Sequence, residues 1–415
     1  MLKFTIDAKV PGGRARAGRI ETPHGVIETP AFIPVGTKAT VKALSPEQVR
    51  DDVGAQAILA NTYHLYLQPG VEVLRKAGGL GKFMDWSGPT FTDSGGFQAF
   101  SLGLASGKRK GKISFNNSEI GDQNSEFRSL DSDLSAIVDD DGVTFKSVID
   151  GSTHRFTPER SIEIQHAIGA DIIFAFDECI LPGESYERQK QAVERTSLWA
   201  ERCLTAHSGR EQALFGIVQG GRYEDLRKLS AKQIGGTAEG GREFEGFGIG
   251  GSFDKDDIGT AVGWVADGLP ENKPRHLLGI GSEPSDLILG IENGMDTFDC
   301  VAPTRIARNG SVYVKGVKGL RGSAKMTIKK MTVNLLNAAF IEDFSPIDAT
   351  CGCYTCKNYT RAYLAHLFRA KEMFAATLAS IHNLYFVVNL VKEARESIIG
   401  GTFKEWLRHL GIGVR

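Results

Sequence analysis

The sequence contains no run of eighteen apolar residues, and no acidic residue occurs at 300–341. A helix needs about 20 mostly apolar residues to cross a bilayer, so the first absence argues against a membrane span. The N-terminus enters an alternating strand pattern at once and has neither the apolar core nor the cleavage site of a signal peptide. We therefore expect a cytoplasmic protein with no membrane partner.

An excess of one charge sign is also missing, because the formal net charge is −1. The acid-free stretch is the local exception. A solvated surface usually mixes signs, so this stretch suggests contacts with the phosphates of a nucleic acid, while an ordinary basic face is the alternative. Its positive residues are Arg305, Arg308, Lys315, Lys318, Arg321, Lys325, Lys329 and Lys330.

Cysteine is scarce, yet three of the six cysteines, Cys351, Cys353 and Cys356, fall within six residues, and His382 follows after a stretch that predicts a helix. Three thiolates and an imidazole are a usual four-ligand shell of structural Zn²⁺, which leaves no position for a reactive water. The alternative is three reduced thiols and a histidine satisfied in the core. The scattered remaining cysteines suit a reducing compartment.

Composition is that of a globular protein, with 41% hydrophobic and 24% charged residues among 415. Eight short apolar runs end abruptly at polar residues or glycine, as buried strands do. They lie at 31–36, 57–61, 89–93, 172–177, 214–219, 246–250, 276–281 and 297–301.

Helical patterns fill the longer gaps between these runs, for example from Pro158 and over 186–207. Apolar strands alternating with helices predict an α/β protein with a parallel sheet. We expect a closed (β/α)8 TIM barrel at 1–315, with an open doubly wound sheet as the alternative. Residues 316–415 are predicted to form a C-terminal zinc-binding subdomain that continues as helix beyond Cys356.

The stretch 103–141 interrupts the barrel pattern. It carries a basic run, then Asn, Ser and acidic residues, with little periodicity. A loop of this length inside a compact domain is usually a lid or a disordered insertion. We favour a flexible insertion.

Polar residues at the strand ends form the candidate active site, because barrel enzymes place their chemistry at the carboxyl ends of the strands. Any one of these residues could equally be a cap or a turn former. A set that converges on one rim is more informative. The set comprises Asn61, Asp93, Asp177, Gln219, Gly250 and Asp299.

Five strings in one order, followed by the Cys and His cluster, resemble the tRNA-guanine transglycosylases (queuine tRNA-ribosyltransferases), most closely the bacterial type. The resemblance covers nearly the whole chain outside 103–141 and 317–337. The strings are NTYH at 61–64, TDSGGFQ at 92–98, SIEIQH at 161–166, FDEC at 176–179 and FDCVAPTR at 298–305.

The resemblance implies a pentosyltransferase that replaces guanine at the wobble position of tRNAs with G-U-N anticodons by a queuosine precursor. It implies that Asp299 attacks C1′ and forms a covalent intermediate, while Asp93 acts as the general acid/base. Asp93 is expected to rest against Asn61 and Thr62 before substrate arrives. Two displacements would retain the configuration at C1′.

The same resemblance assigns the base-binding residues. Asp177 and Gln219 match the readers of the base edge, and the backbone of Gly250 and Gly251 meets its exocyclic side. Phe97 and Leu278 match the apolar sandwich around the heterocycle, although from the sequence alone both are equally well explained as core residues.

Contacts with the tRNA and between subunits are also implied. Arg305 and Arg308 match positions that grip the anticodon loop, and Lys315 is assigned to the same surface. Members of this family commonly form homodimers, so a dimer through the zinc region is expected.

The residues after Gly251 depart from the family pattern, since 252–256 read SFDKD where a small apolar run is usual. The resemblance implies that this segment contacts the substituent of the incoming base, so the departure bears on which base is used. We predict 7-aminomethyl-7-deazaguanine, with queuine as the alternative. A non-catalytic tRNA-binding subunit of the same fold and a carbohydrate-active barrel are rival functions. The first should lack the nucleophile or the base-reading residues, whereas this chain keeps Asp299, Asp93, Asp177 and Gln219. The second leaves the basic stretch and the zinc subdomain unexplained.

Overall fold

The computed structural model describes residues 2–104, 136–207, 211–251, 253, 257–315 and 332–411. All eight predicted apolar runs are strands of one parallel sheet, which confirms the α/β class. The strands are β4 (Ala31–Pro34), β5 (Ile58–Ala60), β6 (Thr90–Thr92), β10 (Ile172–Phe174), β11 (Ala213–Val218), β14 (Gly246–Ile249), β15 (Arg275–Leu277) and β16 (Thr297–Cys300).

The sheet is a closed ring. Its strands follow the order β4-β16-β15-β14-β11-β10-β6-β5. The ring closes between its first and last members, where Val35 just after β4 makes a parallel bridge to Leu59 of β5. The predicted barrel is thus confirmed, and the alternative of an open doubly wound sheet is wrong.

Strand side chains alternate between the inside and the outside of this ring. In β10, Ile172 and Phe174 join the cluster that fills the barrel, whereas Ile173 joins the cluster against the helices. In β11, Phe215 and Ile217 point inward and Leu214 points outward in the same manner. Successive side chains of a strand face opposite sides, so continuous apolar runs are what a strand buried on both faces requires.

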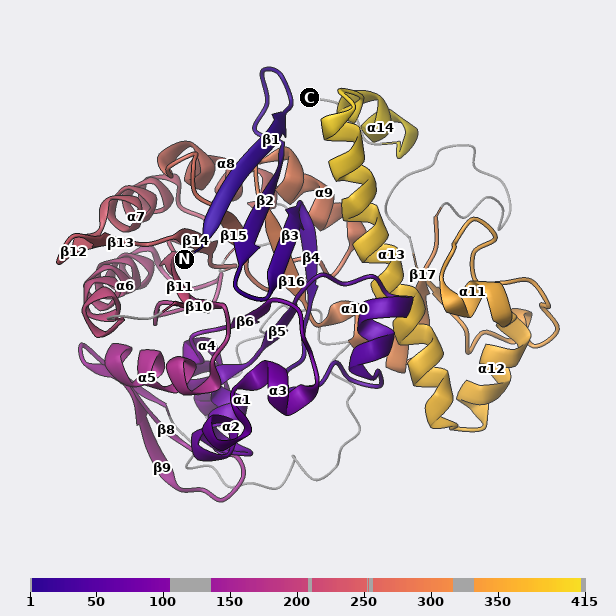
Figure 1. Cartoon of the computed structure of the whole chain (residues 1–415), viewed down its shortest axis with the longest axis horizontal. Coiled ribbons are helices and arrows are strands. Elements are labelled where there is room, and N and C mark those ends of the chain that lie inside the picture. The colour runs from indigo at the N-terminus through magenta and orange to yellow at the C-terminus, as the bar shows by residue number, and fades with distance from the viewer. Residues whose placement is uncertain are drawn as a thin grey trace.

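Helices surround the ring (Figure 1). The two predicted from the sequence begin at side-chain caps, because Thr157 accepts a hydrogen bond from the backbone N–H of Arg160, and Ser185 from that of Arg188. The helices of this part of the chain are α1 (Thr62–Leu67), α2 (Val71–Ala77), α3 (Leu80–Met84), α4 (Gly96–Leu104), α5 (Pro158–Ile168), α6 (Tyr186–Ala206), α7 (Glu224–Gly236), α8 (Ile258–Gly268), α9 (Pro284–Glu292) and α10 (Ala302–Arg308), with a π-helical turn at Gln48–Asp52.

A three-stranded antiparallel sheet covers the N-terminal end of the barrel. It consists of β1 (Lys3–Lys9), β2 (Arg16–Thr22) and β3 (Gly25–Thr29). Ile20 and Ile27 from this sheet pack in the same cluster as the barrel interior. Arg16 forms a buried ion pair with Asp296 at 2.6 Å, just before β16. The opposite end of the barrel is therefore the end available for a site.

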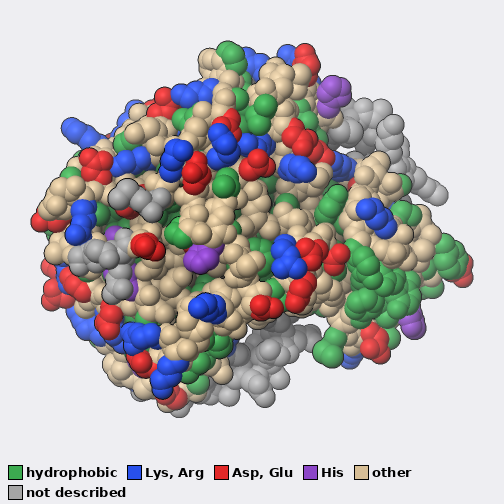
Figure 2. All heavy atoms as spheres, viewed as in Figure 1, with side chains coloured by type: hydrophobic (Ala, Val, Ile, Leu, Met, Phe, Trp, Pro, Cys, Tyr) green, Lys and Arg blue, Asp and Glu red, His purple; other side chains and the backbone are tan. Residues whose placement is uncertain are grey.

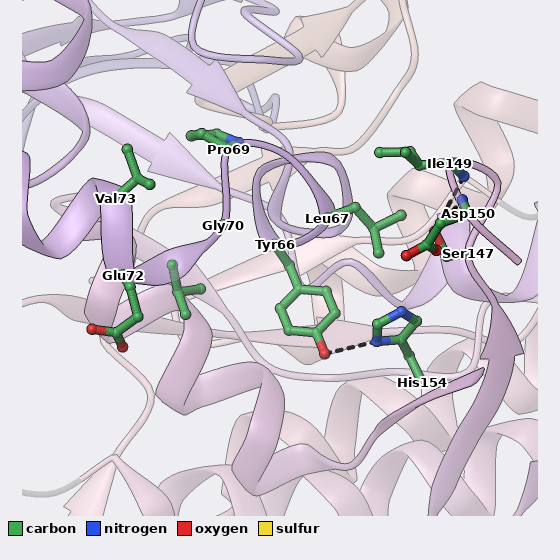
Figure 3. A pocket seen from close by; sticks show the side chains of 11 residues that line it. Tyr66, Leu67, Pro69, Gly70, Glu72, Val73, Ser147, Ile149, Asp150 and His154 are labelled. Atoms are coloured by element: carbon green, nitrogen blue, oxygen red, sulfur yellow. Dashed lines mark hydrogen bonds between the residues drawn. The ribbon is translucent and has the colours of Figure 1, made fainter. Parts of the chain in front are cut away.

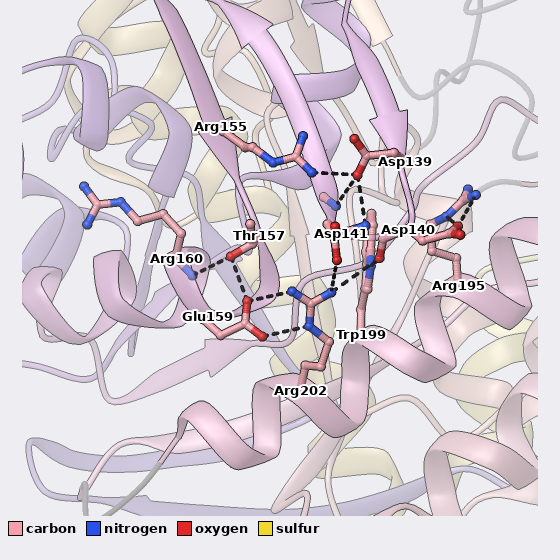
Figure 4. Close-up of polar contacts among 11 residues, drawn as sticks. Asp139, Asp140, Asp141, Arg155, Thr157, Glu159, Arg160, Arg195, Trp199 and Arg202 are labelled. Atoms are coloured by element: carbon pink, nitrogen blue, oxygen red, sulfur yellow. Dashed lines mark hydrogen bonds and ion pairs between the residues drawn. The ribbon is translucent and has the colours of Figure 1, made fainter.

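A second antiparallel sheet stands beside α5 and α6, made of β7 (Ile137–Asp139), β8 (Gly142–Lys146) and β9 (Thr153–Phe156). Ion pairs stabilise this sheet and its contact with α6. Asp139 pairs with Arg155 at 2.6 Å, and Asp140 pairs with Arg195 of α6 at 2.9 Å (Figure 4). The prediction of an insertion without structure up to 141 is wrong for this last part, while 105–135 lie outside the described residues. A two-strand hairpin, β12 (Ala238–Glu239) with β13 (Arg242–Glu243), follows α7.

The C-terminal part wraps around one side of the barrel (Figure 1). The single helix expected beyond Cys356 is wrong, because three helices occupy that stretch and Lys371 adopts a left-handed φ of 58° between the second and third. The elements are β17 (Ser311–Tyr313), β18 (Thr332–Asn334), a 3-10 turn at Ala338–Phe340, α11 (Tyr354–Asn358), α12 (Arg361–Arg369), α13 (Met373–Ile399) and α14 (Phe403–His409). The predicted division at 315/316 falls at the edge of the undescribed 316–331.

Helix α13 joins the two parts. It lies against α11 and α12 on one side and against α9, α10 and β4 on the other. Its Arg395 donates to the carbonyl oxygens of Gly18 and Thr29 in the N-terminal sheet at 2.8 and 2.7 Å. Among the described helices it alone is long and apolar enough to cross a membrane, but 67% of the relevant window is buried inside the protein. Its apolar character thus serves packing.

Candidate active site and metal centre

The six polar or glycine residues predicted for the rim do lie at the carboxyl ends of adjacent barrel strands. Asn61 follows β5, Asp93 follows β6, Asp177 lies beyond β10, Gln219 follows β11 and Gly250 follows β14, while Asp299 belongs to β16. Since all these strands are parallel, their carboxyl ends share one rim. The following contacts show which residues come together.

Asp93 is held by the start of α1. Its Oδ2 accepts from Nδ2 of Asn61 at 2.5 Å, and its Oδ1 accepts from the backbone N–H of Thr62 at 2.8 Å. The expected resting contact is therefore present. Burial raises the pKa of the Asp93 carboxyl to about 7, opposed by the Thr62 N–H and assisted by the negative charges of Asp299 and Asp177. A carboxyl with this pKa can take up and release a proton near neutral pH.

Asp299 is buried, with 8% of its surface exposed. Its Oδ1 accepts two hydrogen bonds, from Nε2 of His276 at 3.0 Å and from the backbone N–H of Gly279 at 2.9 Å. Sequence reasoning missed His276, although it opens one of the predicted apolar runs. An isolated histidine inside such a run gives no sign of its partner.

Asp177 and Gln219 contact each other directly. Nε2 of Gln219 donates to Oδ2 of Asp177 at 2.7 Å, and the hydroxyl of Ser94 donates to the other oxygen at 3.1 Å. Burial raises the pKa of Asp177 to about 6, and these two donors oppose the rise. Ser94, which follows Asp93 in the sequence, was not predicted as a site residue.

Glycine at 250 and 251 permits close packing at this rim. A Cβ at Gly250 would lie 2.4 Å from Nε2 of Gln219, and one at Gly251 would lie 3.1 Å from the carbonyl oxygen of Leu278. The Gly250 carbonyl accepts from Nη2 of Arg227 at 3.0 Å. Any side chain at 250 would displace the Gln219 amide, so the close approach requires glycine there.

The two predicted sandwich residues differ in environment. Phe97, in the first turn of α4, is 41% exposed, so the alternative that it is a core residue is wrong. Leu278 follows β15 and packs partly against the cluster inside the barrel. An exposed aromatic ring beside buried polar groups offers a surface on which a flat heterocycle can stack.

The basic residues next to the rim are only partly described, because 316–331 are not. Arg305 lies on α10 and is exposed. Arg308 lies one turn further along the same helix. Lys315 forms an ion pair with Glu393 of α13, and its backbone N–H donates to Asp348 at 2.8 Å. Lys315 is therefore already engaged within the C-terminal part, unlike the exposed Arg305.

The predicted metal ligands do come together. One ligand atom from each of Cys351, Cys353, Cys356 and His382 can be chosen so that all four lie within 4.8 Å of one another. Nδ1 of His382 is 3.8, 3.5 and 3.3 Å from the three sulfurs in that order. Metal bonds of about 2.3 Å to sulfur and 2.0–2.1 Å to nitrogen at a tetrahedral centre require separations of this size. The cluster can hold a metal ion.

A surface hollow of about 340 Å³ is also present in the described part of the chain, away from these residues (Figure 3). It lies between α1, α2 and the loop joining β8 to β9. The Tyr66 hydroxyl and Nδ1 of His154 are hydrogen bonded at 2.9 Å in its wall. None of the predicted site residues lines it, so the candidate active site remains the rim of the barrel.

The structure combines a closed (β/α)8 barrel, carboxylates from several strands at one rim and a Cys₃His cluster beside the barrel. These features define a TIM-barrel enzyme with a separate metal-binding part. The family model for queuine tRNA-ribosyltransferase matches residues 12–411. The chain belongs to the queuine tRNA-ribosyltransferase family, whose members are pentosyltransferases, and the resemblance found in the sequence is confirmed.

Relatives named queuine tRNA-ribosyltransferase are similar over almost their full length. The protein of Thermoanaerobacter sp. (strain X514) is 48% identical over 96% of this chain and 93% of its own. That of Moorella thermoacetica is 46% identical over 97% and 95%, and that of Roseiflexus sp. (strain RS-1) is 45% identical over 98% and 99%. The likeness thus covers both the barrel and the C-terminal part.

Proposed function

We propose that the protein exchanges guanine at the wobble position of G-U-N anticodons for 7-aminomethyl-7-deazaguanine, by double displacement through a covalent tRNA–Asp299 intermediate. The observation that carries the proposal is the pair of carboxylates at one rim. Asp299 is fixed through a single oxygen, and Asp93 has a pKa raised to about 7. The tRNA and the class of base are inferred from the relatives, which are named queuine tRNA-ribosyltransferases.

In the first displacement, a carboxylate oxygen of Asp299 attacks C1′ of the target ribose. The O–C1′ bond forms while the C1′–N9 bond breaks, and guanine leaves with the electron pair and gains a proton. A buried carboxylate is well suited to this step, because the surrounding protein excludes the water that would otherwise attack the same carbon.

In the second displacement, Asp93 takes the N9 proton of the incoming base. N9 then attacks C1′, and the Asp299 carboxylate is released. Two inversions at one carbon give net retention. Asn61 and Thr62 keep Asp93 in place until it acts, and its raised pKa allows the proton to be accepted near neutrality.

Recognition of the base depends on the joined pair Asp177 and Gln219. A carboxylate and an amide at one buried edge supply both acceptors and a donor for the Watson–Crick edge of guanine. Gly250 and Gly251 bring backbone groups to the exocyclic side, and Phe97 with Leu278 supplies the apolar faces. The target base must leave its stack to reach this site, at small cost in an unpaired loop.

The identity of the incoming base depends on the 252–256 segment, of which only Phe253 is described. Phe253 is buried under Arg227, whose guanidinium carbon lies 4.8 Å from the ring centre. We prefer 7-aminomethyl-7-deazaguanine because the sequence of this segment contains a carboxylate, Asp256, and a carboxylate is a suitable partner for an amine. Competition against labelled guanine decides the matter, since much stronger inhibition by queuine than by the aminomethyl base would favour the alternative.

The tRNA is proposed to bind over α10, where Arg305 and Arg308 lie only six and nine residues after the nucleophile Asp299 in the sequence. Arginine suits phosphate because its planar fork donates two parallel hydrogen bonds. Lys315 contributes to the same surface in one of two ways. Its side chain can contact phosphate once the ion pair with Glu393 opens, or its backbone N–H, bonded to Asp348, can hold this part of the surface in place.

The metal is proposed to be one structural Zn²⁺ per subunit. Three thiolates and one imidazole are the donor set zinc prefers, and with four protein ligands it keeps no open position for catalysis. The ion would cross-link the loop before α11 to α13.

A homodimer is proposed through the apolar face, defined by Phe344, Tyr354, Tyr363, Met373 and Phe374. Met373 is 88% exposed and Phe344 76%. Hydrophobic side chains gather over α11, α12 and the start of α13 (Figure 2). An exposed cluster of large apolar side chains is typical of an interface.

The deciding experiment incubates the protein with unmodified tRNA bearing a G-U-N anticodon and labelled guanine, and counts the label in the tRNA. Asp299→Asn tests the nucleophile, and Asp267→Asn, on the exposed end of α8, is the control. Incorporation by the wild type and the control, but not by Asp299→Asn, supports the proposal. If all three proteins bind tRNA but none incorporates labelled guanine, the protein would instead be a non-catalytic subunit.

A further inference from the structure

His276 is fully buried in β15, directly beneath the rim. Its imidazole lies among the interior aromatic rings, with centroids 5.5 Å from Phe91 and 5.2 Å from Phe174. Its side chain is thus enclosed by apolar rings except where its two nitrogens find partners. Those partners are on β16, because the parallel register places His276 opposite Thr297.

Two hydrogen bonds fix the orientation of the ring. Nε2 is 3.0 Å from Oδ1 of Asp299, and Nδ1 is 2.8 Å from the hydroxyl of Thr297. An ionised carboxylate can only accept, so Nε2 carries the hydrogen. The Thr297 hydroxyl can then donate to Nδ1. The ring is therefore held from both nitrogens by residues of β16.

The contacts restrain one oxygen of the nucleophile. Among the described residues, the Asp299 carboxylate accepts from Nε2 of His276 and from the backbone N–H of Gly279, and both donors contact Oδ1. Oδ2 is the oxygen that remains for C1′. The two donors thereby fix the orientation of the carboxylate relative to the rim.

We propose that His276 is a positioning residue for the glycosyl-transfer step. Through Nε2 it holds Oδ1 of the Asp299 carboxylate so that Oδ2 is left to face the sugar, and Thr297 holds the ring in place through Nδ1. The inference rests on the proposed function and assigns a role to a residue outside its catalytic pair. The expected benefit is one of orientation, for which displacement by about 1 Å can cost about 100-fold in rate.

A purely structural histidine is the competing explanation. Loss of its two hydrogen bonds would then lower stability without a selective effect on turnover. The two explanations differ in which kinetic constant moves, since positioning of a nucleophile affects kcat and leaves the KM for tRNA nearly unchanged.

The test uses three substitutions and the labelled-guanine exchange assay on the full chain. His276→Leu removes the donor at similar volume, and His276→Gln keeps an amide N–H that can reach the place of Nε2. Thr297→Val removes only the hydroxyl. We expect kcat to fall about 30-fold or more for His276→Leu, to stay within about threefold for His276→Gln and to fall about tenfold for Thr297→Val, with the KM for tRNA within about twofold throughout.

Unchanged kcat in His276→Leu and Thr297→Val, alongside normal exchange by the wild type, would overturn the inference and leave the proposed function intact. Absence of exchange by the wild type would overturn both. If His276→Leu does not fold, Thr297→Val decides alone, since it is nearly isosteric and leaves the imidazole in place.

Discussion

His382 donates from Nε2 to the carbonyl oxygen of Tyr313 at 2.7 Å, and this bond turns Nδ1 toward the three cysteine sulfurs. The backbone of β17 thereby sets the tautomer and orientation of the proposed metal ligand. Such partners of ligating histidines usually strengthen metal binding. The centre is thus built from three segments, namely the cysteine loop, α13 and β17.

Removal of one ligand should expose the role of the metal. We expect Cys353→Ala to lose bound zinc and to melt at lower temperature, because a structural zinc site contributes directly to folding. Metal content by atomic emission and thermal unfolding measure the two effects. Cys203→Ala is the control, since this cysteine is buried outside the cluster and the variant should keep its zinc. Full zinc content and normal melting in Cys353→Ala would contradict the assignment.

The raised pKa of Asp93 predicts a pH effect on stability. The unfolded carboxyl ionises near pH 4, whereas the folded one holds its proton until about pH 7. The folded state therefore binds more protons between these values, and Asp93 makes the protein less stable as the pH rises through this window. Asp93→Asn should lose less stability than the wild type between pH 4.5 and 8. Urea unfolding at both pH values tests this, and parallel curves would refute it.

The same residue predicts the pH dependence of exchange. If Asp93 accepts the proton of the incoming base, the second displacement should accelerate as the pH rises through about 7. Asp93→Asn should form the covalent tRNA complex but release it slowly and without this inflection. A denaturing gel that retains the protein–tRNA adduct measures the first point. Normal turnover in the variant would exclude Asp93 as the base.

Asp177 should govern base affinity rather than tRNA affinity. Asp177→Asn is expected to raise the KM for guanine by 10- to 100-fold, on the order of 1–3 kcal/mol for a mismatched buried hydrogen bond. Glu178→Gln is a matched control, because that carboxylate pairs with Arg188 and Arg195 instead of facing Gln219. The control should change thermal stability more than the KM for guanine. Equal increases in the KM for guanine in the two variants would contradict a specific role of Asp177 in base binding.

Arg227 should stabilise the backbone around Gly221 and Gly250 beside the site. The guanidinium is fully buried and donates to the carbonyl oxygens of Gly221, Val218 and Gly250. Its replacement by Met leaves buried acceptors unsatisfied and should cost about 3 kcal/mol of unfolding free energy. Arg50→Met, which breaks only an exposed pair with Asp51, should cost less than about 1 kcal/mol. A similar loss in both variants would contradict this explanation.

The apolar face should control oligomeric state. We expect Met373→Asp to convert a dimer into a monomer in sedimentation experiments, with the fold preserved because this side chain is 88% exposed. Leu198→Asp, at a residue 60% exposed on α6, should leave the dimer unchanged. A wild-type protein that sediments as a monomer at micromolar concentration would refute the interface.

The barrel was predictable because its information is local. Each strand is a short apolar run that stops at a polar residue, and β10 is typical, with Ile172 to Phe174 followed closely by Asp177. Parallel strands placed those stops at one rim, so the candidate site followed from the strand assignment. Asp93, Asp177 and Asp299 needed no long-range information.

The features that sequence reasoning missed depend on distant partners. The acidic run at 139–141 was assigned to a flexible insertion, but Asp139 and Asp140 form ion pairs with Arg155 and Arg195. The contact between His276 and Asp299 follows from the register of β15 on β16, which the order of residues does not reveal. The break before α13 falls at Lys371, where neither glycine nor proline signals a turn.

The pairing of β4, the first barrel strand in the sequence, with β16, the last, determines when the barrel can be completed during synthesis. β4 pairs with β16, so its open edge waits for some 260 residues of chain to be made. The same chain must then supply α13, whose Arg395 donates to carbonyl oxygens of β2 and β3 in the N-terminal sheet. A ribosome that stalls anywhere in between would display an unpaired strand edge, which makes the unfinished chain a natural client for chaperones.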